Sequence, residues 1–378
     1  MIKILTIIGA RPQIIKAAAL SRAIKNSFSD KIKEKILHTG QHYDENMSEV
    51  FFEEMNIPKP HFNLNIGSGK HGEQTAKMIS RIEQILLNEL FDTVVVFGDT
   101  NSTLAGAITA SKLNIPIVHV EAGLRSFNMA MPEEINRIVC DQLSTLLFAP
   151  TETAMKNLEN EGFMTSKASF KDGKKRQVFH SGDIMYDNSL YFAEIAEQKT
   201  DILQRLNLKN QEFVLATIHR DNNTDNPERL TEIIEALIEI SEKIKIVLPL
   251  HPRTKKLLPQ NLSKEIYDKL QSNNIIIIPP ASFFEIIVLE KHSQLVMTDS
   301  GGLQKEAYFF KKPCVILRPE TEWVELVEQQ VGILADADKE SILNAFEKLS
   351  QSKPNFPPVF GDGRSAEFTL KKIIEVFE

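Results

Sequence analysis

The chain has 378 residues, too many for one ordinary core, so two domains are expected. Its composition, with 42% hydrophobic and 25% charged residues, is typical of a soluble globular protein. Its formal net charge of −7 argues against a nucleic-acid partner, and we interpret the basic stretch at residues 171–176 as a polar loop. No apolar run approaches the roughly 18 residues that cross a bilayer, so no membrane partner is expected. Residues 1–9 predict a strand rather than a signal peptide, and the expected location is cytoplasmic. The two cysteines, Cys140 and Cys314, stand in apolar surroundings and are interpreted as small core residues.

Short β-branched runs alternate with helical patterns along the chain. Strands are expected at residues 2–8, 34–38, 93–97, 117–120, 146–149, 178–180, 213–217, 244–248, 275–278, 294–297 and 314–317. Helices are expected at residues 12–26, 43–55, 71–89, 101–113, 133–145, 151–161, 187–206, 227–243, 263–271, 301–310, 322–328 and 338–350. This alternation predicts an α/β fold of two doubly wound domains with parallel sheets, facing a cleft lined by the carboxyl ends of strands.

The composition changes at residues 162–177, a Lys-, Ser- and Gly-rich stretch that predicts a domain boundary. We therefore expect a first domain at residues 1–170 and a second at residues 178–355. A Pro- and Gly-rich loop then leads to a last amphipathic helix at residues 364–378.

Acidic side chains gather after the strands of the first half. Asp99 follows strand 93–97, Glu121 follows strand 117–120, and Glu133 and Glu134 begin the next helix. Carboxylates at strand ends, beside arginines such as Arg125 and Arg137, suit proton transfer on an anionic substrate.

Two simpler interpretations of the acidic cluster stay open. Glu133 and Glu134 follow Pro132 and could only cap the helix, an interpretation that fits Glu134 better. His119 and Glu121 are two residues apart and could share a strand face as metal ligands. No further ligand spacing accompanies them, so we expect no metal site.

Two turns could bind an anion at a helix start. Residues 9–16 join a strand to a helix and carry Arg11 and Lys16, although solvated cations in an ordinary turn would look the same. Residues 298–307 contain Ser300, Gly301 and Gly302, whose hydroxyl and backbone N–H groups suit a diphosphate, with Glu306 a turn further on for ribose hydroxyls. A plain helix cap is the alternative there. No GxGxxG or Walker pattern supports a dinucleotide or P-loop site.

Two further strand ends carry histidine and arginine. His219 and Arg220 follow strand 213–217, and His251 follows strand 244–248. A histidine at such an end could act on a phosphate oxygen or a leaving group, or could be purely structural.

Together these motifs resemble those of the non-hydrolysing UDP-N-acetylglucosamine 2-epimerases. The matching segments are residues 9–12, 39–42, 98–100, 119–125, 132–137 and 299–302, with Glu306. The resemblance implies two Rossmann-like domains of the glycosyltransferase-B type, a C-terminal helix packed on the first domain, and a homodimer. It also implies inversion at C2 of a UDP-2-acetamido sugar, by anti elimination of UDP to a 2-acetamidoglycal and re-addition, with no cofactor.

The resemblance also implies roles for individual residues. Asp99, Glu121 and Glu133 are the acid/base candidates, and His219 would assist the departure of UDP. The remaining substrate-binding candidates are Arg11, Lys16, Arg137, Arg220, His251, Ser300, Gly301, Gly302 and Glu306.

Several positions bear on which sugar is used. Gln13 stands where many family members have Glu, and Trp323 lies in a segment that reads Thr-Glu-Arg-Pro-Glu in many of them. Both differences resemble a subgroup acting on UDP-2,3-diacetamido-2,3-dideoxyglucuronate, and they predict that Gln13→Glu shifts preference toward UDP-N-acetylglucosamine. Gln41, His42 and Gln74 match positions near an activator site of some members, but their flanking residues differ.

Other functions compete with this interpretation. A UDP-sugar glycosyltransferase of the same fold would share the UDP site without requiring the whole acidic set. A hydrolysing 2-epimerase would release UDP and a free sugar. A non-catalytic nucleotide-sugar binder is disfavoured, because carboxylates beside a diphosphate weaken its binding.

Overall fold

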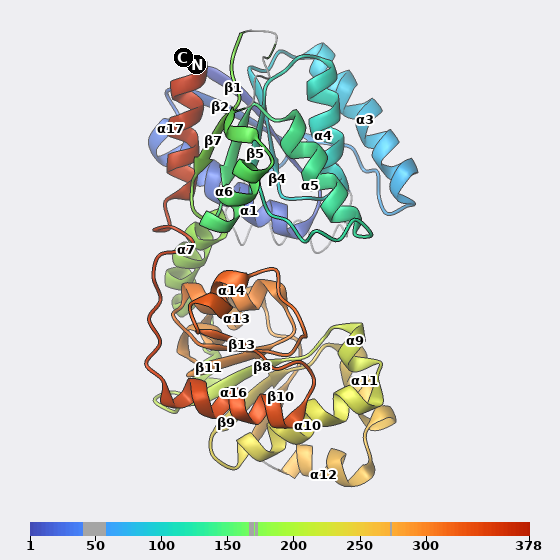
Figure 1. Cartoon of the computed structure of the whole chain (residues 1–378), viewed down its shortest axis with the longest axis vertical. Helices are drawn as coiled ribbons and strands as arrows, with labels where there is room; N and C mark the ends of the chain where they lie inside the picture. Colours follow the sequence, from blue (N-terminus) through green and yellow to red (C-terminus); the bar gives the residue numbers. More distant parts are fainter. Residues whose placement is uncertain (41–57, 166–169, 171–172, 273) are drawn as a thin grey trace. The chain divides into compact units, whose positions relative to one another are not determined.

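The computed structural model describes residues 1–40, 58–165, 170, 173–272 and 274–378. The helix expected at residues 43–55 therefore lies outside the described residues. The chain divides into one unit of Met1–Asn188 with Pro358–Glu378 and a second unit of Ser189–Pro357. It passes from one unit to the other inside helix α7 (Ile184–Lys199) and returns after Pro357 (Figure 1).

The first unit is built on a parallel sheet. Its described strands number seven and follow the order β3-β2-β1-β4-β5-β6-β7. Their bounds are Ile2–Ile8 (β1), Ile32–His38 (β2), Phe62–Asn63 (β3), Thr93–Phe97 (β4), Ile117–Val120 (β5), Leu146–Ala149 (β6) and Gln177–His180 (β7). Residues of β4 such as Val94 and Val96 have no exposed surface, as expected for a strand covered on both faces.

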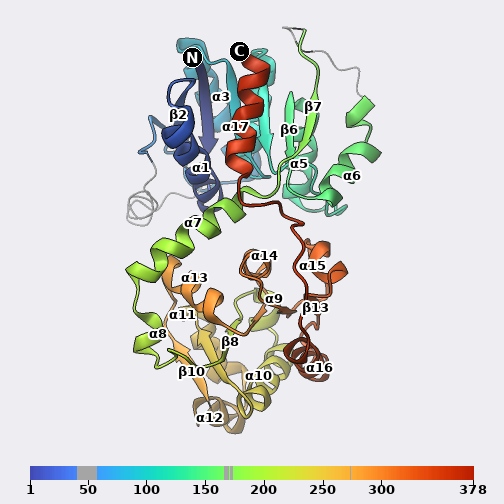
Figure 2. The same ribbon diagram turned by 90° about the vertical axis from the view of Figure 1, so that its left-hand side faces the viewer.

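Helices cover both faces of this sheet. They are α1 (Arg11–Ala23) with the π-helical turn η1 (Ile24–Phe28), α3 (His71–Asn88), α4 (Asn101–Lys112), α5 (Pro132–Leu143), α6 (Glu152–Asn160), the 3-10 turn η2 (Phe163–Thr165) and α17 (Ser365–Phe377). Helices α1 and α17 lie side by side on one face (Figure 2), while α4 packs between α3 and α5 on the other (Figure 1).

The second unit contains a second parallel sheet. Six described strands follow the order β10-β9-β8-β11-β12-β13, namely Phe213–Thr217 (β8), Lys245–Pro249 (β9), Ile275–Ile278 (β10), Leu295–Thr298 (β11), Cys314–Ile316 (β12) and Gly332–Leu334 (β13). The helices are Ile202–Arg205 (α8), Asp221–Thr224 (α9), Pro227–Ser241 (α10), Pro252–Asn261 (α11), Lys264–Ser272 (α12), Phe283–His292 (α13), Gly301–Phe309 (α14), Val324–Glu328 (α15) and Lys339–Gln351 (α16). Both sheets have the doubly wound α/β form that the sequence predicts.

The C-terminal helix belongs to the first unit. The Asp187 carboxylate of α7 accepts the backbone N–H groups of Ser365 and Ala366 at 3.0 and 2.8 Å, which caps α17. Phe368 of α17 packs edge-on against Phe179 of β7, with ring centroids 6.2 Å apart.

Some elements differ from the sequence-based expectation. Strand β7 pairs with β6 in the first sheet, whereas the sequence analysis assigns it to the second domain. Helices α11 and α13 were not expected, because α11 contains Pro259 and α13 is apolar on nearly every side, which hides its helical period. Within the described part of the chain, no helix is long and apolar enough to span a bilayer.

Candidate active site

In the first unit, an ion pair joins two of the predicted site residues. Lys16 of α1 reaches the carboxylate of Glu121, which follows β5, and their side chains are only 10% and 13% exposed. Gly98 follows β4 with φ +59°, and a Cβ there would lie 3.4 Å from Lys16 Nζ. That distance is an ordinary contact, so it is the positive φ, which L side chains rarely adopt, that favours glycine at this turn.

The backbone at Glu121 is itself in an unusual conformation. Its φ is +72°, a region that costs a non-glycine residue roughly 1–3 kcal/mol. The N–H groups of Glu121 and Ala122 both bond the Phe148 carbonyl at 3.0 Å, which holds the turn. Such strain is common where a side chain must be aimed for chemistry, so it supports a functional role for Glu121.

A second cluster brings Asp99 and Arg137 together. Arg137 of α5 forms ion pairs with Asp99 and with Glu134, the latter at 3.0 Å. Asn136, the neighbour of Arg137, donates to the Asp99 carbonyl at 2.8 Å. Helix α5 therefore fixes both the backbone and the side chain of Asp99, which keeps 31% of its side chain exposed.

The adjacent glutamates at the start of α5 differ in environment. Glu134 is 1% exposed and accepts the N–H groups of Ser126 and Phe127, each at 2.9 Å. Burial alone would raise the pKa of Glu134, but these bonds and the Arg137 charge hold it below its ordinary value. Glu133 is exposed to solvent. Glu134 thus holds the loop that precedes α5, and Glu133 is the carboxylate available to a ligand.

His119 supports the loop that carries Glu121 and does not face a ligand. Its Nδ1 lies 2.7 Å from Asp141 Oδ1, and its Nε2 lies 2.8 Å from the Gly98 carbonyl oxygen. The Asp141 carboxylate and the Gly98 carbonyl both accept hydrogen bonds, so both ring nitrogens of His119 carry protons. Burial alone would lower the pKa of His119, yet Cys140 and Asp141 raise it well above its ordinary value.

The environment of His119 also excludes its suggested role as a metal ligand, since neither ring nitrogen has a free lone pair. No group of at least three His, Cys, Asp or Glu side chains suited to a metal occurs among the described residues. Asp141 in turn accepts bonds from Arg125 and the Gly123 N–H at 2.7 and 3.1 Å, so it holds the loop after β5. The sequence analysis missed Asp141, which lies within helix α5, twenty residues after Glu121.

Gln13 is a scaffold residue. It is 1% exposed, and its Oε1 accepts the N–H groups of Gly9 and Ala10 at 2.9 and 3.2 Å. Its Nε2 donates to the Phe97 carbonyl and to Thr103 Oγ1, both at 2.9 Å. These bonds tie the β1–α1 turn to the end of β4. The amide has no bonding capacity left for a sugar, so Gln13 cannot act on substrate preference by direct contact.

The other residues that the sequence analysis singles out in the first unit differ in their surroundings. Arg11 is exposed at the first residue of α1, where a helix start favours an anion. Gln74 is 6% exposed, donates to the Gly67 carbonyl at 2.7 Å and accepts from Asn101 at 2.9 Å, so it is part of the scaffold. Gln41 and His42 lie outside the described residues.

In the second unit, His219 is oriented by Asp299. The Asp299 carboxylate is fully buried and accepts the backbone N–H groups of His219 and Arg220 at 3.1 and 3.0 Å. Its Oδ1 also lies 2.9 Å from Nδ1 of His219, whose side chain is 50% exposed. Burial alone would raise the pKa of Asp299, but its bonds to His219 and Arg220 hold it below its ordinary value.

The sequence analysis includes Asp299 in a motif but gives it no role of its own. Asp299 directly precedes Ser300, a predicted site residue, and it directly follows β11, while Asp99 comes two residues after the end of β4. This position at a strand end, next to a predicted site residue, was the signal in the sequence that could have found Asp299. With Nδ1 of His219 bonded to Asp299, the exposed side chain presents Nε2 for proton exchange or for a bond to a phosphate oxygen.

The turn at the start of α14 has the form of an anion site. Ser300 is the N-cap, and its Oγ accepts the Leu303 N–H at 3.4 Å. A Cβ at position 301 would lie 2.4 Å from Glu322 Oε1, so the Glu322 side chain would have to move to accommodate any other residue there. Gly302 is exposed, so the first helical N–H groups are open to a ligand.

Other predicted residues of the second unit lie around its strand ends. Glu306 is partly buried, one turn inside α14. Behind it, burial and the Glu306 charge raise the pKa of the fully buried Glu290 well above its ordinary value, so Glu290 keeps its proton. Arg220 is exposed, and His251 caps α11 by accepting the Arg253 N–H at 3.3 Å.

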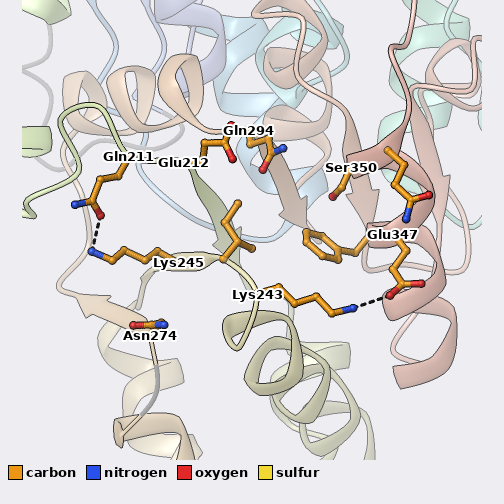
Figure 3. A pocket seen from close by; sticks show the side chains of 11 residues that line it. Gln211, Glu212, Lys243, Lys245, Asn274, Gln294, Glu347 and Ser350 are labelled. Carbon is orange, nitrogen blue, oxygen red and sulfur yellow. Dashed lines mark hydrogen bonds and ion pairs between the residues drawn. The ribbon is translucent and has the colours of Figure 1, made fainter.

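A cavity of about 600 Å³ in the second unit lies at a different edge of the sheet (Figure 3). Lys243 and Lys245 line it beside the start of β9, where they bond Glu347 and Gln211 at 2.6 and 2.5 Å. His219 and Ser300 follow the opposite, carboxyl ends of their strands. This cavity is therefore separate from the predicted site.

Comparisons with known proteins agree with the motifs. The profile of the UDP-N-acetylglucosamine 2-epimerase family matches residues 24–377. The UDP-N-acetylglucosamine 2-epimerase homolog of Methanococcus maripaludis is 48% identical over 376 residues, 99% of each chain. The UDP-2,3-diacetamido-2,3-dideoxy-D-glucuronate 2-epimerase of Pseudomonas aeruginosa is 48% identical over 377 residues, 98% of this chain and 99% of that one.

A solved structure extends the similarity to the fold. The crystal structure of Methanocaldococcus jannaschii UDP-GlcNAc 2-epimerase in complex with UDP-GlcNAc and UDP has a TM-score of 0.80 to this chain and 45% sequence identity. The similarity covers 99% of this chain and all of that one. With its doubly wound sheets and its strand-end carboxylates, the chain belongs to the UDP-N-acetylglucosamine 2-epimerase family of isomerases.

Proposed function

We propose that this protein is a UDP-2-acetamido-sugar 2-epimerase that inverts C2 between the gluco and manno configurations. The observation that carries the proposal is the combination of two sets of groups in one chain. One set is Asp99, Glu121 and Glu133 at strand ends of the first sheet, and the other is the turn at Ser300 beside the His219–Asp299 pair. The first set suits proton transfer and the second suits a diphosphate.

The first half of the reaction is an elimination. A carboxylate takes the proton from C2, the C1–O bond breaks, and UDP leaves with the bonding electrons as a C1=C2 double bond forms. The C2 proton is only weakly acidic, so its removal must accompany the departure of UDP. His219 and the open N–H groups at Gly302 would stabilise the charge that develops on the diphosphate.

The second half forms the two broken bonds again, with the proton now reaching the opposite face of C2. UDP adds back to C1 of the 2-acetamidoglycal while a carboxylic acid delivers a proton to the opposite face of C2. Two carboxyl groups of different protonation state are therefore needed, and Asp99, Glu121 and Glu133 are the candidates. Electrons and protons balance within the sugar nucleotide, so the reaction requires no redox cofactor.

The remaining site residues have binding roles in this proposal. Arg11 and Lys16 add positive charge in the first unit, and Arg137 orients Asp99. In the second unit, Glu306 is suited to accept bonds from the ribose hydroxyls, while Arg220 and His251 lie beside strand ends where the nucleotide would approach. We also propose that the enzyme acts in the cytoplasm as a homodimer, which light scattering at micromolar concentration would test.

Proton NMR in deuterated water tests the function directly. UDP-N-acetylglucosamine and UDP-2,3-diacetamido-2,3-dideoxyglucuronate are incubated in parallel with the enzyme. We expect deuterium at C2 together with the manno epimer, while most UDP stays within the sugar nucleotide. Sequence similarity does not decide between the two sugars, because related proteins with each name are equally similar to this chain. The two rates, compared directly, identify the preferred substrate.

Other outcomes would replace the proposal. Free 2-acetamido sugar that accumulates in step with UDP would identify a hydrolysing 2-epimerase. Transfer of the sugar to an added acceptor, with no exchange at C2, would identify a glycosyltransferase. Glu121→Gln keeps the size of the side chain and removes its charge, so it tests the need for this carboxylate once circular dichroism shows that the variant is folded.

A further inference from the structure

The single tryptophan of the chain, Trp323, directly precedes α15 and contacts the turn at the start of α14. Trp323 is 7% exposed, and its Nε1 donates a 2.9 Å hydrogen bond to the carbonyl oxygen of Gly301. Gly301 is the first residue of α14, directly between Ser300 and Gly302. The indole therefore holds the peptide group from which the open N–H of Gly302 projects.

The face of the same indole ring supports a buried cation. The Lys305 ammonium lies 4.2 Å from the ring centroid, and Lys305 is 5% exposed. A cation over an indole face is stabilised by the ring quadrupole, most strongly where water is excluded. The first turn of α14 contains no acidic residue, so the Lys305 charge adds to the positive end of the helix.

Neighbouring bonds hold Trp323 in this position. Thr321 Oγ1 accepts the Trp323 backbone N–H at 3.1 Å and donates to Gln304 Oε1 at 2.6 Å. Arg318 pairs with Glu322 at 2.8 Å, and Glu322 lies against Gly301. The segment from Arg318 to Trp323 thus contacts α14 at its first residue and again one turn later.

From these contacts we propose that Trp323 is a positioning residue for diphosphate binding, which fixes the Gly301 peptide through Nε1 and the Lys305 charge through its ring. This inference rests on the proposed function, because it concerns the same diphosphate. In this role the buried indole acts beneath the turn and needs no contact with the sugar. This position also makes Trp323 an internal reporter, because a diphosphate at Gly302 changes the field at the ring.

The first measurement is tryptophan fluorescence of the full chain during titration with UDP, with uridine as the matched ligand without phosphates. Because the chain has one tryptophan, all indole emission comes from Trp323. We expect a saturable change in emission with UDP and none with uridine at the same concentration. In Lys305→Met, the emission of the ligand-free protein should already be shifted, because the cation on the ring is gone.

Calorimetry on two variants measures the effect on affinity. Trp323→Phe keeps an aromatic face for Lys305 but removes the Nε1 donor, and its Kd for UDP should rise roughly tenfold. Phe346→Leu is the control, since Phe346 is 6% exposed in the same unit and lines the cavity at the opposite sheet edge. It should leave the Kd within about twofold, a change near the usual scatter of such measurements.

The outcomes separate this inference from the proposed function. If the wild-type protein does not bind UDP by calorimetry, the proposed function fails. Suppose instead that UDP binds, that Trp323 emission does not respond, and that Trp323→Phe has the wild-type Kd. The proposed function would then stand and the role of Trp323 would be overturned. An equal loss of affinity in Trp323→Phe and Phe346→Leu would also overturn it, because general destabilisation would explain both.

Discussion

The buried Asp299 carboxylate pairs with the half-exposed His219 ring, and its Oδ1 lies 2.9 Å from Nδ1 of the ring. The same carboxylate accepts the His219 backbone N–H, so it fixes both the position of the residue and the tautomer of its side chain. One residue at the end of β11 therefore determines how His219, at the end of β8, presents its Nε2.

Asp299→Asn should lower kcat by roughly 100-fold, because the amide can donate to Nδ1 and so reverse the tautomer of His219. The backbone bond to His219 can persist, so circular dichroism should be unchanged. Rates measured on the preferred UDP-sugar check this prediction, with His219→Asn and the double variant as controls. The double variant should be no slower than His219→Asn, because the two residues act as a unit. Wild-type kcat in a folded Asp299→Asn protein would contradict the prediction.

Sequence patterns predicted the central strands closely, because strands buried on both faces are short apolar runs. Strands 93–97, 117–120 and 146–149 coincide with β4, β5 and β6. The two-residue β3 and the short β13 have too few residues for a pattern. Strand β7 looked like the start of a new domain because a polar loop precedes it, whereas its pairing with β6 depends on contacts distant in sequence.

The site was predictable where residue type and position agreed, and not where the partner was remote. Strand-end carboxylates such as Glu121 are visible in the sequence, but its pairing with Lys16, 105 residues away, is not. Gln13 stands in a motif where many family members have Glu, which predicted an effect on substrate preference. Only the fold reveals that the hydrogen-bonding groups of its amide are all used by Phe97, Thr103 and the β1–α1 turn.

Breaking the Lys16–Glu121 pair should be strongly destabilising, because each partner leaves a nearly buried charge behind. Lys16→Met alone and Glu121→Gln alone should each cost roughly 3–5 kcal/mol in the free energy of unfolding. The double variant should cost clearly less than the sum of the two, because no unpaired charge remains. Urea unfolding of all four proteins gives the coupling energy. Strictly additive losses would mean that the pair does not form in solution.

Gln13→Glu should destabilise the first unit without changing substrate preference. A carboxylate cannot donate to the Phe97 carbonyl, so we expect a loss of about 1–3 kcal/mol in the free energy of unfolding. Gln211→Glu, the same change at an exposed position, should be nearly neutral. The ratio of kcat/KM for the two candidate UDP-sugars should equal the wild-type ratio. A shift toward UDP-N-acetylglucosamine would instead restore the substrate role that the sequence analysis gives to Gln13.

Asp187 should make the stability of the first unit depend on pH. Burial, only partly offset by the bonds from Ala366 and Ser365, raises its pKa from 3.8 to about 6. Because the folded state binds this proton more tightly, stability from this group is fully present below about pH 4 and is lost as the pH rises through about 6. A shift of this size corresponds to about 3 kcal/mol.

Asp187→Asn removes that ionisation while its Oδ1 can still accept a backbone N–H at the start of α17. Relative to wild type, the variant should therefore gain about 3 kcal/mol in the free energy of unfolding between pH 4 and pH 7.5. Asp362→Asn is the control for a nearby carboxylate and should show no such gain. Urea unfolding at several pH values gives the difference curve. A flat difference for Asp187→Asn would mean that the α17 cap is an ordinary ionised carboxylate, so that burial in the folded state does not hold its proton.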